Sequence, residues 1–316
     1  MGREGRERNT RPVGFVLLPG SITPFWRNSE DGPYAITKGG IMAVRTAGVF
    51  VYFSIAAFLF GGTADSTQFP EIRLNDRVLI LLHSPWQETM TVIDAGPSLI
   101  LVDTWGSLAS AKRAKVRIDS LFHKSVRFVI NTHHHWDHTF GNAAFEGAAT
   151  QIVGHRFCAE DMRADYKDAE IRKQYFENNA SRTEFEPLRS YIRSVGTESS
   201  DAAFPIAPPT RTTGERDTLR EGDLTFILYP TPGIHTRSNL TIYVPELGIV
   251  FGRWEFANPS NVKLEPGADP RLIAKVLDDV LAAGKPIHYL ISGHGNPIEN
   301  PDLKTGMEGL KGMNKK

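Results

Sequence analysis

The chain lacks the features that define several large classes of protein. Its 316 residues include a single cysteine, Cys158, so it has neither an intrachain disulfide nor a cysteine-based zinc finger. Its 36 basic residues balance 36 acidic residues, and this balance gives no overall attraction to nucleic acid or to an anionic membrane. It also lacks a fixed-period repeat and a Gly-x-Ser-x-Gly nucleophile elbow. We therefore expect no nucleic-acid partner and no catalytic role for the unactivated Cys158 thiol.

Long apolar runs are also scarce, and the strongest one is short for a membrane span. It covers residues 47–61, whereas a transmembrane helix needs about 20 apolar residues. Arg45 precedes the run, and the small residues of the sequence GGTA end it. This order is typical of a secretory signal peptide, and Met42 lies where such a peptide would begin. We therefore predict a signal peptide at residues 42–64 and a periplasmic or secreted protein.

Residues 1–41 show no periodic core pattern, and we interpret them as an unstructured extension that comes from a start codon assigned too far upstream. The alternative is that residues 47–61 remain as a membrane anchor behind a cytoplasmic tail. The protein would then contact a membrane only through this segment. N-terminal sequencing distinguishes the two, because cleavage predicts a mature N-terminus near Asp65 and an anchor predicts an intact Met1.

The remaining residues 65–316 have the length of a single domain. Runs rich in Val, Ile, Leu and Thr between turn residues predict strands, and long charged stretches with little Gly or Pro predict helices. Strands are expected at residues 77–83, 88–94, 98–104, 126–131, 224–229, 239–244, 248–251 and 287–291. Helices are expected at residues 107–123, 155–194 and 270–283, with a loop at residues 199–213. Strands and helices alternate within each half, an order that favours a sheet-on-sheet core flanked by helices.

A histidine cluster follows the strand expected at residues 126–131. Residues 132–138 read THHHWDH, and four histidines within six residues are hard to explain as ordinary core residues. Neutral imidazole is the commonest metal ligand, and alternate residues of an extended segment share a face. His133 and His135 can therefore converge on one metal ion. Asp137 and His138 lie just beyond, where the chain turns, and can reach a second ion.

This segment matches the His-x-His-x-Asp-His signature of the metallo-β-lactamase superfamily, and other segments resemble that family in the same order. LVDT at residues 101–104 and GN at residues 141–142 resemble the segments that flank the signature. PGIHT at residues 232–236 and SGHG at residues 292–295 are similar to the two downstream histidine segments. The resemblance covers about residues 77–297. It implies an α/β (α+β) fold: the αββα sandwich of two mixed β-sheets flanked by helices, with a metal centre at one edge.

Carried over by position, the resemblance implies a centre for one or two zinc ions. The ligands of the first ion would be His133, His135 and His235. The ligands of the second ion would be Asp137, His138 and His294. Asp103 is expected to support the metal loop rather than to bind metal, and His134 to point away. Four further histidines have no motif context and are interpreted as structural or solvent-facing: His83, His123, His155 and His288.

The family pattern breaks after the strand expected at residues 248–251. Many members carry a Gly-Asp pair there, and its aspartate bridges the two metal ions. Aligned on Phe251, the position of that aspartate is taken by Trp254. Three interpretations are open. The second ion uses only an aspartate and two histidines, Glu255 replaces the missing carboxylate, or the second site is weak and one ion suffices.

The resemblance implies a hydrolase in which zinc lowers the pKa of its bound water to about 7, so that hydroxide attacks the substrate. Asp137 is expected to be the catalytic residue that orients this nucleophile. Arg253 is a candidate to bind a substrate carboxylate, because guanidinium groups bind carboxylates with two hydrogen bonds. Fold does not define substrate, so we expect an exported hydrolase of an ester, thioester or amide bond in a small molecule, with a β-lactam as a minority case. The alternative, prompted by Trp254, is a catalytically weak or silent metal-binding accessory protein.

Overall fold

The computed structural model describes residues 69–258, 264–266 and 268–313, together with three strands closer to the N-terminus. The chain divides into two compact units, Met1–Ala64 and Asp65–Lys316. In the first unit, an antiparallel sheet has the order β1 (Tyr34–Ile36), β2 (Met42–Thr46) and β3 (Val49–Phe53). The rest of the predicted signal peptide lies outside the described residues, so export remains a prediction. Within the described ranges, no helix combines the length and the apolar character needed to cross a membrane.

The second unit contains two mixed β-sheets. A seven-stranded sheet has the order β10-β9-β8-β7-β6-β5-β4. Its strands are β4 (Glu71–Asn75), β5 (Val78–His83), β6 (Glu88–Asp94), β7 (Leu99–Val102), β8 (Val126–Ile130), β9 (Gln151–His155) and β10 (Arg211–Thr213). Strands β4 to β7 pair antiparallel, whereas β7 to β10 pair parallel. The antiparallel half therefore needs only short turns, and the parallel half needs crossover connections that contain helices.

A six-stranded sheet runs from β11 to β16 in sequence order. Its strands are β11 (Asp217–Glu221), β12 (Leu224–Pro230), β13 (Leu240–Val244), β14 (Ile249–Phe251), β15 (Tyr289–Ile291) and β16 (Ile298–Glu299). All neighbours pair antiparallel except β14 and β15, which pair parallel.

The core lies between the sheets because successive side chains of a strand point to opposite faces. In β5, Val78 and Ile80 contribute to the cluster between the two sheets, which also contains Phe226 of β12. Leu79 and Leu81 alternate with them and belong to a second cluster on the outer face. Both faces of β5 are therefore buried, which is why its sequence is continuously apolar rather than alternating.

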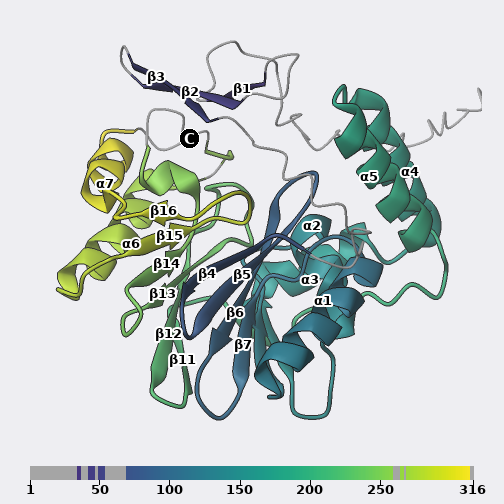
Figure 1. The fold of residues 1–316 in the computed structure, drawn as a ribbon, viewed down its shortest axis with the longest axis horizontal. Coiled ribbons are helices and arrows are strands. Elements are labelled where there is room, and N and C mark those ends of the chain that lie inside the picture. The colour runs from purple at the N-terminus through teal and green to yellow at the C-terminus, as the bar shows by residue number, and fades with distance from the viewer. Residues whose placement is uncertain are drawn as a thin grey trace, which may run out of the picture. The chain divides into compact units, whose positions relative to one another are not determined.

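Helices cover the two outer faces. Helix α1 (Leu108–Phe122) buries Ala111, Ala114 and Ile118 against the seven-stranded sheet. Helices α6 (Pro270–Ala282) and α7 (Leu303–Lys311) cover the six-stranded sheet on the other side (Figure 1). The αββα sandwich with two mixed sheets, expected from the sequence, is confirmed.

The single long helical stretch expected at residues 155–194 is wrong in its continuity. The structure has three helices there, α3 (Arg156–Asp165), α4 (Ala169–Arg182) and α5 (Glu186–Ser199). The Asp168 side chain accepts hydrogen bonds from the backbone N–H groups of Glu170 and Ile171 and so begins a new helix. Pro187 lies in the first turn of α5, where its missing N–H costs nothing. The loop expected at residues 199–213 ends in β10. The sequence analysis did not predict five further elements: β4, β9, β11, β16 and α7.

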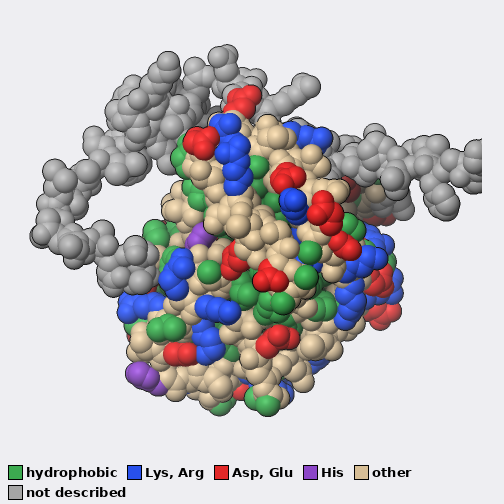
Figure 2. All heavy atoms as spheres, turned by 90° about the vertical axis from the view of Figure 1, so that its right-hand side faces the viewer, with side chains coloured by type: hydrophobic (Ala, Val, Ile, Leu, Met, Phe, Trp, Pro, Cys, Tyr) green, Lys and Arg blue, Asp and Glu red, His purple; other side chains and the backbone are tan. Residues whose placement is uncertain are grey.

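Helices α4 and α5 form a hairpin beside the predicted metal loop. Buried Arg172 of α4 donates to the carbonyl oxygens of Ser199 (2.6 Å), Asp201 (2.9 Å) and Tyr166 and so links the two helices. Their apolar sides pack in one cluster with Trp136 of the loop that follows β8. Figure 2 shows the face on the right-hand side of Figure 1, where basic and acidic side chains are interspersed. Because α4 and α5 pack against Trp136, the hairpin supports the metal loop.

Candidate metal centre

The predicted ligands come from loops at one end of the two sheets. The loop after β8 carries His133 and His135 and continues into α2 (Trp136–Thr139), which supplies an aspartate and a further histidine. The loop after β12 carries His235, and the loop after β15 carries His294. Three segments that are far apart in the sequence therefore meet at this end of the sandwich.

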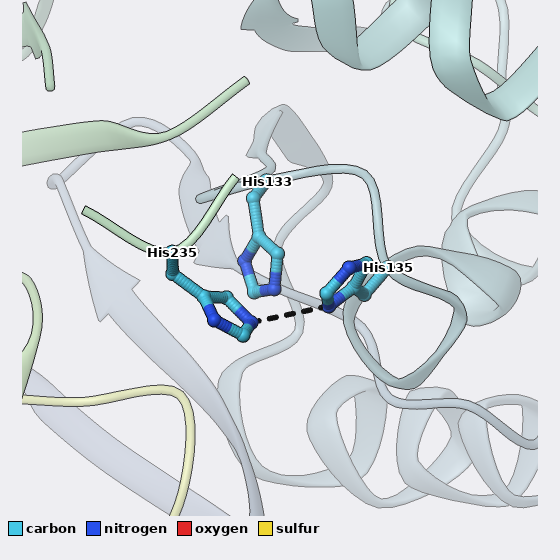
Figure 3. Close-up of side chains that lie close together, drawn as sticks. All are labelled: His133, His135 and His235. Carbon is cyan, nitrogen blue, oxygen red and sulfur yellow. Dashed lines mark hydrogen bonds between the residues drawn. The ribbon is translucent and has the colours of Figure 1, made fainter. Parts of the chain in front are cut away.

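His133, His135 and His235 form one group (Figure 3). One ring nitrogen from each lies within 4.8 Å of the others. Nε2 of His235 is 3.2 Å from Nδ1 of His135, and the ring centroid of His133 is 4.7 Å from that of His135. Three converging imidazoles match the nitrogen ligands that zinc prefers.

Burial keeps these three imidazoles neutral. It lowers the pKa of His133 and His235 well below the ordinary value, and the neighbouring histidines lower both further. It also lowers the pKa of His135 to about 3. A neutral imidazole has a lone pair for a metal ion, so no proton has to leave when the metal binds.

His133 provides the observation that tests whether a metal fits. Its side chain is buried, and Nε2 has no hydrogen-bond partner among the described residues. Its Nδ1 lies 3.1 Å from the hydroxyl of Thr132. An unpaired buried polar atom costs about 1–3 kcal/mol, and a metal ion bound at Nε2 offsets that cost. The three-histidine group therefore fits zinc in both its geometry and its ligand type.

Asp137, His138 and His294 form the second group, also with ligand atoms within 4.8 Å of one another. Oδ2 of Asp137 is 3.2 Å from Nε2 of His138 and 3.1 Å from Nε2 of His294. On the other side of the His294 ring, Nδ1–H donates to the carbonyl oxygen of Trp86 (3.1 Å). That bond directs Nε2 of His294 towards Asp137, as a second-shell partner directs a metal ligand.

The charges in the second group differ from those in the first. Burial disfavours ionisation of Asp137, but His138 and His294 outweigh it and hold the pKa of Asp137 well below its ordinary value. Burial likewise opposes a charge on His138, but Asp137 and Asp103 raise its pKa to about 10. The first group is thus neutral, whereas the second contains an ion pair.

Asp103 directly follows β7 and hydrogen-bonds to two parts of the metal loop, at Thr132 and at His138. Its Oδ1 accepts from the backbone N–H of Thr132 (2.8 Å), and its Oδ2 accepts from the Thr132 hydroxyl (2.7 Å). The same Oδ2 accepts from Nδ1 of His138 (2.8 Å). Asp103 belongs to neither group of ligands among the described residues. The structure therefore places it as a support for the loop.

Glu88 is a buried carboxyl group that the sequence analysis did not single out. It lies in β6, and its Oε2 accepts from the backbone N–H of Gly106 and from the hydroxyl of Tyr191, both at 3.0 Å. Burial first, and then the charge of Asp137, raises the pKa of Glu88 well above its ordinary value. Its backbone pairs with His294, so it supports the loop of the second group. An acidic residue at the start of an apolar strand is the signal that identifies it in the sequence.

His83 is one of the histidines without motif context, and the structure buries it next to Glu88. Its Nε2 lies 2.9 Å from the hydroxyl of Ser110, and its ring packs 5.1 Å from the ring of Trp105. Burial, with a smaller contribution from the charge of Arg113, lowers the pKa of His83 to about 4.

His83 is expected to make the fold sensitive to acid. In the unfolded chain its pKa returns to about 6.5, so between that value and the folded pKa only the unfolded chain binds the proton. Stability is therefore lost as the pH falls through this window. The free energy of unfolding should be measured with urea at about pH 7.5 and at about pH 4.5. Between these values it should fall by about 2–3 kcal/mol more in the wild type than in His83→Gln. Equal losses in the two proteins would show that His83 does not titrate in this way.

The remaining histidines lie outside both groups. Nδ1 of His134 is 2.9 Å from the hydroxyl of Ser238, in the loop that carries His235, so it links the two loops. His155 is buried, and its Nδ1 accepts from the backbone N–H of Phe157 at the start of α3.

Cys158 is buried too, and burial raises the pKa of its thiol well above the ordinary value.

Arg253, rather than Trp254, lies beside the metal groups after β14. Arg253 lines a cavity together with His133, His138 and His294. Trp254 begins the short helix η2 (Trp254–Phe256) and is not among the residues that line this cavity. That Trp254 takes the sequence position of the family's bridging carboxylate stays a prediction. The wall of the cavity after β14 is formed by Gly252 and Arg253.

Glu255 holds Arg253 in place. Its Oε1 accepts from a terminal nitrogen of the guanidinium (2.8 Å), and its Oε2 accepts from Nε (3.1 Å). Both side chains are largely buried. Glu255 therefore acts as the partner of Arg253 in this structure, and neither metal group among the described residues includes it. The proposed contact of Arg253 with a substrate carboxylate remains a prediction.

Comparisons with known proteins agree with this geometry. A family model described as the metallo-beta-lactamase superfamily matches residues 83–252, more than half of the chain. A stereoselective inverting sec-alkylsulfatase from Pseudomonas sp. is similar in structure, with a TM-score of 0.55 and 14% identity. That match covers 77% of this chain but only 41% of the sulfatase.

Two metallo-beta-lactamases are similar over almost their whole length. The one from Pontibacter korlensis has a TM-score of 0.51 and 15% identity, over 78% of this chain and 100% of that protein. The one from Erythrobacter litoralis has a TM-score of 0.50 and 19% identity, over 77% of this chain and 96% of that protein. At these identities the likeness establishes the fold and leaves the substrate open.

Proposed function

Because the chain belongs to the metallo-beta-lactamase superfamily, we propose that it is a zinc-dependent hydrolase of an ester, thioester or amide bond in a small molecule. The observation that carries this proposal is the pair of three-residue groups, each with its ligand atoms within 4.8 Å of one another. His133, His135 and His235 would hold the first zinc ion. Asp137, His138 and His294 form the candidate second site.

Zinc held by these residues would supply activated water at neutral pH and would stabilise negative charge on the substrate oxygen. The chain's own residues position the reactants. Asp137 is ionised and buried, so its carboxylate can accept a hydrogen bond from the attacking water and orient it. Asp103 and Thr132 fix the loop that carries His133, which keeps the ligand nitrogens preorganised.

The family supports a hydrolase in general, and the individual neighbours add candidate substrates to the screen. The similar β-lactamases support testing β-lactams, and the similar alkylsulfatase supports testing a sulfate ester. Because this chain spans less than half of the sulfatase, the carbonyl substrates come first. The screen therefore includes a β-lactam, a thioester, a carboxylic ester and an alkyl sulfate.

The test compares the metal-depleted protein with the same protein after zinc is restored. At least one substrate of the screen should be hydrolysed, and this activity should be lost on chelation and return with zinc. His133→Ala should stay inactive after zinc addition. His123→Asn is the matched control, because His123 is at the end of α1 in a left-handed conformation that asparagine tolerates. A protein that binds zinc but hydrolyses none of the substrates would favour the metal-binding accessory role.

Export is part of the same proposal. Its support is the apolar run at residues 47–61 with Arg45 before it and small residues at its end. N-terminal sequencing of the protein from the periplasm or the medium should find a start near Asp65. An intact N-terminus in the membrane fraction would favour an anchor at residues 47–61.

A further inference from the structure

The turn between β7 and α1, residues 103–106, has an unfavourable backbone conformation. Asp103 has a φ of 56° and Trp105 a φ of 68°. Both angles lie in the left-handed region, which residues other than glycine adopt at a cost in free energy. Such a conformation persists only where contacts with the surrounding structure hold it, so the neighbours of this turn determine its shape.

The turn is hydrogen-bonded to the metal loop along its length. Asp103 accepts from Nδ1 of His138 (2.8 Å). The next residue, Thr104, donates to the carbonyl oxygen of His138 from its backbone N–H (3.0 Å) and from its hydroxyl (3.1 Å). The carbonyl oxygen of Trp105 accepts from the N–H of Gly141 (3.1 Å). A change in the shape of the turn would therefore move His138, a ligand of the second group.

Glu88 holds the last residue of the turn. Its Oε2 accepts from the backbone N–H of Gly106 and from the hydroxyl of Tyr191 in α5, both at 3.0 Å. Glu88 and Gly106 are both buried, so no water is at hand to replace this acceptor if it is removed. The bond to Tyr191 fixes the direction in which the carboxyl group points.

Gly106 leaves the turn no room to shift towards the metal loop. A Cβ atom at this position would overlap the ring of Trp136 and would lie 3.1 Å from Cα of Asp137. The backbone of Gly106 therefore packs directly against the loop that carries the ligands. Glu88 holds this backbone from one side, and the metal loop borders it on the other.

We propose that Glu88 is a positioning residue of the metal centre: by accepting from Gly106, it keeps the turn in the shape that places Asp103 against His138. The proposal rests on the proposed function, in which the two groups hold zinc. Glu88 belongs to neither metal group among the described residues, so it acts through the turn and not as a ligand.

The experiment is a competition titration of the full chain with zinc and a chromophoric chelator. The visible absorption spectrum of the cobalt-substituted protein is recorded beside it, because its bands report the geometry of the ligands. Glu88→Leu keeps about the same volume but removes the acceptor. It should weaken zinc binding about tenfold, the lower end of the range for partners of metal ligands, and should change the cobalt spectrum.

Glu88→Gln tests whether the acceptor or the charge matters. Both hydrogen bonds go to one oxygen, Oε2, and the amide oxygen of glutamine can accept both. This variant should recover most of the affinity that Glu88→Leu loses, together with the wild-type cobalt spectrum. If Glu88→Leu does not fold, Glu88→Met is the second apolar variant, because a flexible methionine adapts more readily to a packed site.

A double variant tests the route through the turn. If Glu88 acts by placing Asp103, then Glu88→Leu should add little to the loss of zinc affinity caused by Asp103→Ala. Leu277→Ala is the control for stability, because Leu277 is fully buried on the outer face of the six-stranded sheet. It should destabilise the fold by leaving a cavity and should leave zinc affinity and the cobalt spectrum unchanged.

Three results would overturn the proposal while leaving the metal centre in place. They are equal zinc affinity in the wild type and Glu88→Leu, a glutamine variant as weak as the leucine variant, and losses that multiply in the double variant. A wild-type protein that binds no zinc would instead contradict the proposed metal centre, and the role of Glu88 with it.

Discussion

Replacing Asp137 with asparagine is expected to lower kcat by about 100-fold to 10,000-fold, the range for loss of a group that moves or orients a proton. The carboxylate is buried and ionised, and its Oδ2 lies 3.2 Å from His138 and 3.1 Å from His294. Asparagine has almost the same shape, so it preserves packing while removing the charge. KM should change much less than kcat, because the carboxylate acts on the attacking water and not on the substrate.

Steady-state kinetics with the best substrate of the screen and zinc content per chain should be measured on the same samples. Asp94→Asn is a matched control, because Asp94 is a partly buried aspartate paired with Lys124 (2.7 Å) at the far end of β6. Its kinetics should equal those of the wild type. If Asp137→Asn kept full turnover and full zinc content, Asp137 would be neither the orienting residue nor a necessary ligand.

Replacing Asp103 with alanine is expected to weaken zinc binding about 10-fold to 100-fold, the range observed for partners of metal ligands. Asp103 accepts two hydrogen bonds from Thr132 and one from Nδ1 of His138. Without it, the His138 ring is free to rotate, and the loop with His133 loses its anchor to β7. Competition titration with a chromophoric chelator measures the change.

Asp103→Asn tests whether geometry or charge matters in this role. Its amide oxygen can still accept from the Thr132 N–H, whereas its NH₂ group cannot accept from His138. Zinc affinity should therefore fall between those of the wild type and the alanine variant. An alanine variant with unchanged affinity would show that the loop holds its shape without Asp103.

Much of this centre could be predicted from the sequence because its chemistry is local. His133, His135, Asp137 and His138 lie within six residues, and the spacing alone suggests converging ligands. His235 and His294 were recognised only by resemblance, since a histidine in a glycine-rich turn carries no signal of its own. The fold was predictable for a similar reason, because strands buried on both faces, such as β5, are continuously apolar.

The parts that were missed depend on contacts between distant residues. Which residue after β14 lines the cavity beside the metal groups is decided by how that strand ends, and Arg253 rather than Trp254 lines it. Glu88 stands out in the sequence only as an acidic residue at the start of an apolar strand, and its partner Tyr191, more than a hundred positions away, is visible only in the structure. The breaks between α3, α4 and α5 depend on single residues, such as the N-cap Asp168, which a pattern of charge does not reveal.

The most direct measurement is anomalous diffraction at the zinc edge from crystals of the protein grown with zinc. The strongest peak should lie among His133, His135 and His235, with each ligand nitrogen about 2.0–2.1 Å away. Any second peak should lie among Asp137, His138 and His294. A zinc-loaded crystal without a peak at the three-histidine group would contradict the account.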